Sequence, residues 1–192
     1  DAGPTVITAP FLFDELFSLC GRRREDHVTF VPVTPFYRIR FHDGRLFDYS
    51  GDPTRMRAEV KRLCATDLPG YDRFMAEAER CYRIGFEELG AVAFDGIGDL
   101  LAAVPALLRM RSWRTMRQLV NRHFRHPQLR MAFSLQPLLI GGNPGSVTCT
   151  YSLINMLERR FGVHWAMGGT HTLVRGLRQH GALRVHDGDI AG

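Results

Sequence analysis

Residues 37–53 read Tyr-Arg-Ile-Arg-Phe-His-Asp-Gly-Arg-Leu-Phe-Asp-Tyr-Ser-Gly-Asp-Pro, and within this stretch the chain changes from a strand pattern to a helix pattern. Two runs rich in aromatic and β-branched residues, 37–41 and 45–49, flank Asp43-Gly44, a dipeptide typical of a tight hairpin turn. Asp52-Pro53 then supplies a helix N-cap followed by proline at the first helical position. The stretch therefore predicts an antiparallel hairpin that leads directly into a helix.

The residues before the hairpin mix short strands with one helix. Strands are expected at residues 5–7 and 28–33, because both runs are rich in β-branched and aromatic residues. A helix over residues 10–19 should end at Gly21, since glycine readily adopts the left-handed conformation found at helix C-termini. One side of this helix carries Leu12, Leu16 and Leu19.

Helical spacing prevails from residue 52 to about residue 161. A helix that opens at 67–69 should carry one apolar stripe, made of Tyr71, Phe74, Ala78, Cys81, Tyr82 and Phe86. Glycines and an Asn-Pro step make 141–145 a loop, and a core-packed helix is expected over 146–161. A last helix should follow Gly168-Gly169-Thr170 and run to about residue 179.

The composition is that of a folded chain. Of the 192 residues, 45% are hydrophobic and 23% are charged, which suits one domain with a substantial core. The four cysteines are widely spaced and form no CxxC pair, so we expect free thiols of a reducing cytoplasm instead of disulfides or a zinc site. No apolar run approaches the roughly 20 residues of a membrane span. Because residue 1 is aspartate and no leader is evident, the chain is expected to begin inside a larger protein.

Positive charge is concentrated in residues 100–130. That stretch contains seven arginines and no acidic residue, whereas the remaining residues sum to −2 within the net charge of +5. A basic face of this kind suits the phosphates of nucleic acid or of lipid. The alternative is a solvated helix face in a chain that favours arginine, since Lys61 is its only lysine.

Motifs of independent catalysis are lacking from the sequence. It contains no GxGxxG, Walker, HExxH or GxSxG motif, so nothing in it directly indicates an independent nucleotide-binding or metal enzyme. His123 and His126 have a helical spacing that would suit a metal ion. Without a carboxylate beside them in the sequence, we interpret them as polar faces of a basic helix, and no metal is expected.

Several ordered motifs together resemble bacterial-type phytoene desaturases, a family of FAD-dependent carotenoid desaturases. The resemblance extends over about 165 residues, and its most specific block is Ala132-Phe133-Ser134 followed by Pro137-Leu-Leu-Ile-Gly-Gly-Asn-Pro144. The other matching segments are Asp1–Thr8, 32–41, Phe47-Asp48-Tyr49, 70–74, 87–90 and 157–163.

The resemblance implies an α+β fold, in which an antiparallel sheet with a helical cap forms the substrate region of a two-domain FAD-dependent oxidoreductase. Residues 1–50 would be the strand-rich part, and 51–163 the helical cap with a possible membrane-facing region. Residues 164–192 would return toward an incomplete FAD-binding domain. Most of the dinucleotide-binding domain, including the glycine-rich turn that holds the FAD pyrophosphate, would be missing. The fragment alone is therefore expected to bind FAD poorly or not at all and to be inactive.

The resemblance also suggests individual site residues. Gly3, Pro4 and Thr5 match a turn near the flavin side of the substrate tunnel, for which a tight strand entry is the alternative explanation. Gly168, Gly169 and Thr170 match a second glycine-rich segment at the cofactor. Asp99 matches an acidic position considered for acid/base catalysis, because a carboxylate in an apolar channel has a raised pKa. The alternative for Asp99 is a helix N-cap.

The chain also departs from the family at these sites. The family commonly has arginines on either side of the acid, where this chain has Gly98 and Ala102. An aromatic pair, proline and arginine usually precede the second glycine pair, where this chain reads His164-Trp165-Ala166-Met167. These differences are compatible with a divergent relative of altered activity.

The expected function is FAD-dependent desaturation of phytoene or a related carotenoid precursor, as part of a longer chain. Its partners would be an apolar polyene and a membrane surface, with no nucleic acid. Residues 100–120, with Trp113 as an interface anchor, suit peripheral attachment of a cytoplasmic protein to a membrane; an internal cap helix is the alternative. Two other functions stay open: a carotenoid isomerase or oxygenase of the same superfamily, and a non-catalytic remnant that binds lipid or another subunit.

Overall fold

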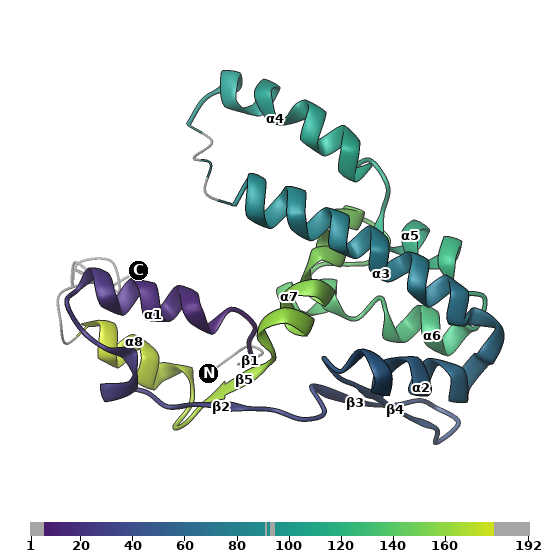
Figure 1. The fold of residues 1–192 in the computed structure, drawn as a ribbon, viewed down its shortest axis with the longest axis horizontal. Coiled ribbons are helices and arrows are strands. Elements are labelled where there is room, and N and C mark those ends of the chain that lie inside the picture. The colour runs from purple at the N-terminus through teal and green to yellow at the C-terminus, as the bar shows by residue number, and fades with distance from the viewer. Residues whose placement is uncertain (1–5, 91, 93–94, 179–192) are drawn as a thin grey trace, which may run out of the picture. The chain divides into compact units, whose positions relative to one another are not determined.

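The computed structural model describes residues 6–90, 92 and 95–178 (Figure 1). The chain divides into two compact units, residues 1–34 with 161–192 and residues 35–160. We call them the terminal unit and the central unit. Both combine helices with a small antiparallel sheet, as the α+β prediction requires. The hairpin at 37–49, grouped with the first fifty residues in the sequence analysis, lies in the central unit.

The terminal unit is built on a three-stranded sheet. Its strands are β1 (Val6–Ile7), β2 (Phe30–Pro32) and β5 (His164–Ala166), and β5 pairs antiparallel with both of the others. The prediction of strands near residues 5–7 and 28–33 is confirmed, whereas β5 was not predicted. Three residues are too few to display an alternating pattern, and the partners of β5 lie more than 130 positions earlier in the chain.

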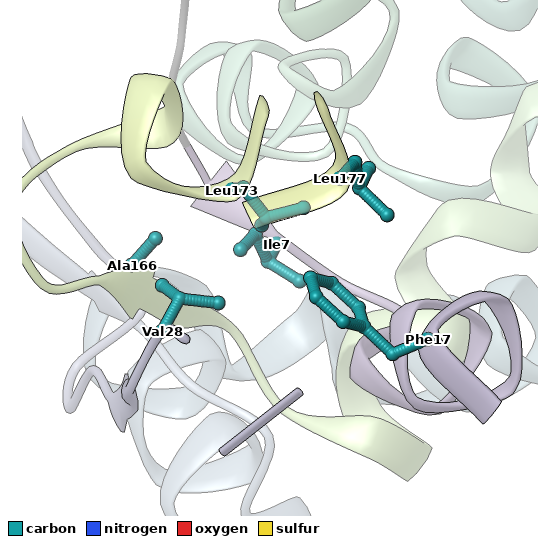
Figure 2. Packing of buried hydrophobic residues seen from close by; sticks show 6 residues of the cluster. All are labelled: Ile7, Phe17, Val28, Ala166, Leu173 and Leu177. Atoms are coloured by element: carbon teal, nitrogen blue, oxygen red, sulfur yellow. The ribbon is translucent and has the colours of Figure 1, made fainter. Parts of the chain in front are cut away.

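Two helices complete the core of the terminal unit. Helix α1 (Pro10–Leu19) has the predicted bounds and is followed by Gly21 at φ +66°, and α8 (Thr170–Arg178) follows the glycine pair as expected. Figure 2 shows the side chains that gather between these helices and the sheet: Ile7, Phe17, Val28, Ala166, Leu173 and Leu177. The leucine side of α1 does not join this core, since Leu12, Leu16 and Leu19 are all exposed.

The predicted hairpin opens the central unit. Strands β3 (Tyr37–Arg40) and β4 (Leu46–Tyr49) pair antiparallel, and the turn places Gly44 at φ +83°, a conformation that glycine adopts without strain. Helix α2 (Pro53–Cys64) follows, and Asp52 Oδ1 accepts hydrogen bonds from the backbone N–H groups of Thr54 (2.8 Å) and Arg55 (3.2 Å). The predicted N-cap is therefore confirmed.

The rest of the central unit is helical. Its longer helices are α3 (Leu68–Tyr82), a π-helical continuation (Arg83–Glu88), α4 (Ile97–Met110), α5 (Met116–His123), α6 (Pro127–Ala132) and α7 (Leu153–Phe161). Short 3-10 helices also occur here: η2 (Ala65–Asp67), η4 (Gln136–Ile140) and η5 (Cys149–Ser152). The remaining 3-10 helix, η1 (Arg24–Asp26), belongs to the terminal unit. The apolar stripe predicted for α3 is buried from Tyr71 to Tyr82. It packs against a cluster of aromatic rings in which Phe124 and Phe133 stack in parallel with centroids 4.7 Å apart.

The helix predicted over 146–161 begins later than expected. Ser146 and Val147 both donate their backbone N–H groups to the carbonyl of Asn143, which closes the glycine-rich loop at 141–145. The carbonyl of Val147 accepts a hydrogen bond from Met116 N at 3.0 Å. This tertiary bond occupies the carbonyl that would otherwise accept from Tyr151 N in a helix, and Tyr151 N donates instead to Thr148 O. Regular structure therefore starts at η5.

Candidate functional site

The glycine pair at 168–169 forms a compact turn between β5 and α8. Both residues have positive φ values, +81° and +86°, and Gly169 N–H donates to Ala166 O at 2.9 Å. The hydroxyl of Thr172 donates to Gly169 O (2.7 Å) and also lies 3.2 Å from Met167 O. A Cβ atom at Gly168 would lie 2.8 Å from Thr172 Cγ2. Two features therefore require glycine at position 168: the positive φ of its backbone and the close approach of the Thr172 side chain.

The turn at the glycine pair differs from a dinucleotide-binding turn. It presents a bend without side chains, and Thr170 begins the following helix. A dinucleotide pyrophosphate is usually held by a glycine-rich turn between a strand and the next helix with GxGxxG spacing, and the sequence contains no such spacing. The other predicted cofactor residues, Gly3, Pro4 and Thr5, lie outside the described residues.

Asp99 lies on the exposed N-terminal turn of α4. Its Oδ2 accepts hydrogen bonds from the backbone N–H groups of Gly96 (3.1 Å) and Asp95 (3.2 Å). This is the geometry of a side chain that satisfies unpaired backbone groups at a helix start. The contacts seen for Asp99 are thus those of the capping alternative.

Helix α4 carries an uncovered apolar face. Its small residues Ala103 and Ala106, with Met110, are buried, and Ala106 and Met110 pack against Cys81 and Ile84. The opposite face is exposed and consists of Ile97, Leu100, Leu101, Val104 and Leu108, with Trp113 just beyond the helix. Leu101 and Trp113 each expose nearly two thirds of their surface, 65% and 64%. Among the described residues no helix is long and apolar enough to cross a membrane.

The arginines near α4 do not form a uniformly solvated face. Arg109 pairs with Glu88 at 2.8 Å, and Arg111 lies 3.8 Å from Glu77. Arg130 donates from Nε to the carbonyl of Phe124 at 2.8 Å. Acidic residues from the preceding helices therefore offset part of the positive charge of residues 100–130, which sequence spacing alone did not reveal.

The two histidines do not share one helix. His123 ends α5 and is buried, whereas His126 is the N-cap of α6, so the expectation of two faces on a basic helix was wrong. A carboxylate distant in the sequence lies beside His123, since Glu77 Oε2 is 3.6 Å from His123 Nε2. Burial lowers the pKa of His123 despite this neighbour. Within the part of the chain that the structure describes, no group of three or more His, Cys, Asp or Glu could hold a metal ion.

The central unit also contains a buried polar cluster that the sequence pattern did not predict. Glu158 of α7 is fully buried, and its carboxyl accepts hydrogen bonds from the hydroxyl of Tyr37 (2.6 Å) and the side-chain amide of Gln136 (3.4 Å). Beside it, the Tyr49 hydroxyl donates to Asn155 Oδ1 at 2.6 Å. One sequence signal existed: Glu158 lies four residues after Ile154 and next to Leu157, on the side of the helix expected to pack.

Comparison with known proteins decides the family. The chain is 42% identical over 177 residues to a lycopene-forming phytoene desaturase of Pseudescherichia vulneris, a match that covers 92% of this chain and 36% of that protein. The chain is a homologue of bacterial phytoene desaturases. It is also 37% identical over 191 residues to the neurosporene-forming phytoene desaturase of Cereibacter sphaeroides, covering 97% of the chain and 37% of the relative. No family model matches the chain.

The homology is continuous but partial. A more distant relative, the 4,4'-diapophytoene desaturase of Methylomonas, is 29% identical over 184 residues, again 93% of this chain and 35% of the relative. The chain thus spans about a third of the length of the curated relatives that it matches. The resemblance that the sequence motifs indicated is confirmed, including its extent along nearly the whole chain.

Proposed function

We propose that this chain forms part of an FAD-dependent desaturase that removes hydrogen from phytoene or a closely related polyene. The observation that carries the proposal is the identity of 37–42% to phytoene desaturases along 92–97% of the chain. The aligned region includes residues of both units. The proposal therefore concerns the shared segment as a whole and not an isolated motif.

The proposed reaction converts a CH–CH bond into a C=C bond by removal of a hydride and a proton. FAD, when bound, supplies the acceptor for the hydride. The proton passes to a carboxylate or to water. In this proposal Gly168, Gly169 and Thr170 lie beside the flavin, because their turn brings backbone close without intervening side chains. The pyrophosphate contacts would come from segments that this sequence does not contain.

Asp99 remains a proposed acid/base residue, with helix capping as the alternative. Its exposure and its two backbone hydrogen bonds favour capping. A carboxylate that exchanges protons with a polyene would have to become enclosed by substrate, membrane or further protein. Acid/base catalysis and helix capping predict different effects on turnover when Asp99 is replaced by an uncharged residue.

We further propose that α4 attaches the protein peripherally to a membrane. Its exposed leucines and Trp113 would enter the boundary between headgroups and acyl chains, and the exposed Arg109, which also pairs with Glu88, would lie near anionic headgroups. A surface of this kind would give a lipid-dissolved polyene access to the protein. The same face also favours the second candidate function, a non-catalytic module that binds lipid.

A segment exchange tests the proposed reaction. The 177-residue segment of the Pseudescherichia vulneris enzyme would be replaced by the homologous segment of this chain, and pigments would be analysed in phytoene-producing bacterial cells. Desaturated carotenoids above the level of cells without the chimera are expected. A chimera that is stable and retains its flavin, yet leaves phytoene untouched, contradicts the proposal. Isomerised or oxygenated products in place of desaturated ones would favour the related superfamily activities.

A further inference from the structure

Glu158 is a buried carboxyl that has no cationic partner among the described residues. It lies on α7 with 0% of its surface exposed, and the groups that bind its carboxyl are a phenol and a primary amide. Within the described residues, burial and these two hydrogen bonds are the causes acting on its pKa, with no contribution from an arginine, lysine or histidine. A buried carboxylate is expensive to ionise unless a positive charge compensates it.

The titratable groups around Glu158 are themselves neutral at ordinary pH. Tyr37 of β3 and Tyr49 of β4 face the carboxyl, and burial together with the charge of Glu158 raises the pKa of both phenols. Gln136 of η4 donates its side-chain amide to the carboxyl, and on α7 the amide of Asn155 accepts from the Tyr49 hydroxyl. Arg159, next along α7, acts on Tyr49 and Tyr71 but is not among the causes that shift Glu158.

The surrounding groups match either protonation state of the carboxyl. Tyr37 donates to Oε1 in both states, and an amide that rotates by 180° exchanges its donor for its acceptor. Gln136 therefore donates to an ionised Oε2 and accepts from a protonated one. The oxygen of Gln136 is buried and has no hydrogen-bond partner in the present orientation. Protonation of the carboxyl removes the cost of keeping a negative charge away from water.

We propose that Glu158 is a proton-binding site of the central unit: its carboxyl joins α7 to the β3–β4 hairpin through Tyr37 and to η4 through Gln136, and the unit is most stable with the carboxyl protonated, because ionisation leaves a buried charge without a compensating cation. Burial raises the pKa of Glu158 from 4.5 to about 7, which places the transition near neutral pH. This inference concerns the fold of the central unit and is independent of the proposed desaturase activity.

The sign of the expected pH dependence follows from linkage. A carboxyl whose pKa is raised in the folded state binds more protons there than in the unfolded chain, so its contribution to stability is greatest below pH 4.5 and is lost as pH rises through about 7. Most carboxylates, with lowered pKa values, act in the opposite direction. Asp43, whose pKa is lowered by hydrogen bonds from Arg45 N–H and Gln128, is one of these.

The test is the pH dependence of urea-induced unfolding for the wild-type chain and for Glu158→Gln, which stays neutral and keeps a donor and an acceptor. Between pH 5 and pH 8 the ratio of their folding equilibrium constants should change by roughly 50-fold in favour of the variant. The exposed Glu15, changed to Gln, is the matched control and should leave the wild-type profile within about 2-fold. A Glu158→Gln profile parallel to the wild type would overturn the proposal.

A second variant covers the case in which Glu158→Gln does not fold. The hydrogen bond from Tyr37 favours the ionised carboxyl, so Tyr37→Phe should raise the pKa of Glu158 further. The infrared band of a protonated carboxyl, present at pH 6 and lost above neutral pH in the wild type, should persist to higher pH in Tyr37→Phe. The absence of such a band at pH 6, or a midpoint that Tyr37→Phe leaves in place, refutes the proton-binding site.

Discussion

The hydroxyl of Tyr49 donates a 2.6 Å hydrogen bond to Oδ1 of Asn155, and it joins the end of β4 to the first turn of α7. Both residues are buried, and Asn155 Nδ2 donates onward to Ser152 O at 3.1 Å. The bond connects residues 106 positions apart and so fixes the hairpin to the last helix of the central unit.

Tyr49→Phe should destabilise the protein because it leaves the buried Asn155 oxygen without a donor. We expect a loss of about 1–3 kcal/mol in the free energy of unfolding, measured by urea denaturation. Tyr49→Phe combined with Asn155→Leu removes both polar groups, so the double variant should cost less than the sum of the two single changes. Strictly additive costs would mean that the bond contributes nothing.

Gly70 allows α3 and α5 to approach closely. A Cβ atom there would lie 1.9 Å from the backbone oxygen of His123, a contact that no side-chain rotation relieves. Gly70→Ala should therefore cost on the order of 2 kcal/mol or more, even though alanine favours helices. Gly98→Ala in α4 is the matched control, since nothing lies within 4 Å of its Cβ position. The control should gain up to about 1 kcal/mol in thermal or urea unfolding.

Membrane attachment by α4 predicts a selective effect of charge on its exposed face. Leu101→Asp should weaken co-sedimentation with anionic liposomes about 10-fold or more, since a charge at the headgroup boundary opposes insertion. Leu19→Asp, an equally drastic change at a leucine of α1 that is 85% exposed, should leave binding unchanged. Equal losses for both variants, or none for Leu101→Asp, would argue for an internal cap helix instead.

Features with a local cause could be predicted from sequence. The hairpin turn needs only Asp43-Gly44 between two strand-forming runs, and the start of α2 needs only the Asp52 side chain and a proline. The helix over residues 10–19 was likewise bounded by its own proline and glycine. In each case the physical reason lies within about five residues, where a single sequence is informative.

Features that depend on distant partners were missed. Strand β5 exists because β1 and β2 provide hydrogen bonds from the opposite end of the chain, and α7 starts late because Val147 bonds to Met116. For the candidate site, the glycine pair lies in the expected turn before a helix, but the burial of Glu158 beneath Tyr37 depends on packing that spacing does not encode. The family itself was recognisable because its motifs are ordered along the whole chain.

Asp99→Asn separates the two roles proposed for Asp99, and the segment-exchanged enzyme is the protein in which to test it. Asparagine keeps an oxygen that can accept from Gly96 N–H and Asp95 N–H, so a capping role predicts little change in stability and near-normal desaturation. An acid/base role predicts a fall in turnover on the order of 100-fold with flavin content retained. The exposed position of Asp99 and the absence of arginines at Gly98 and Ala102 favour the first outcome. Unchanged desaturation of phytoene in liposomes would assign Asp99 to the helix start and leave the reaction to flavin and substrate orientation.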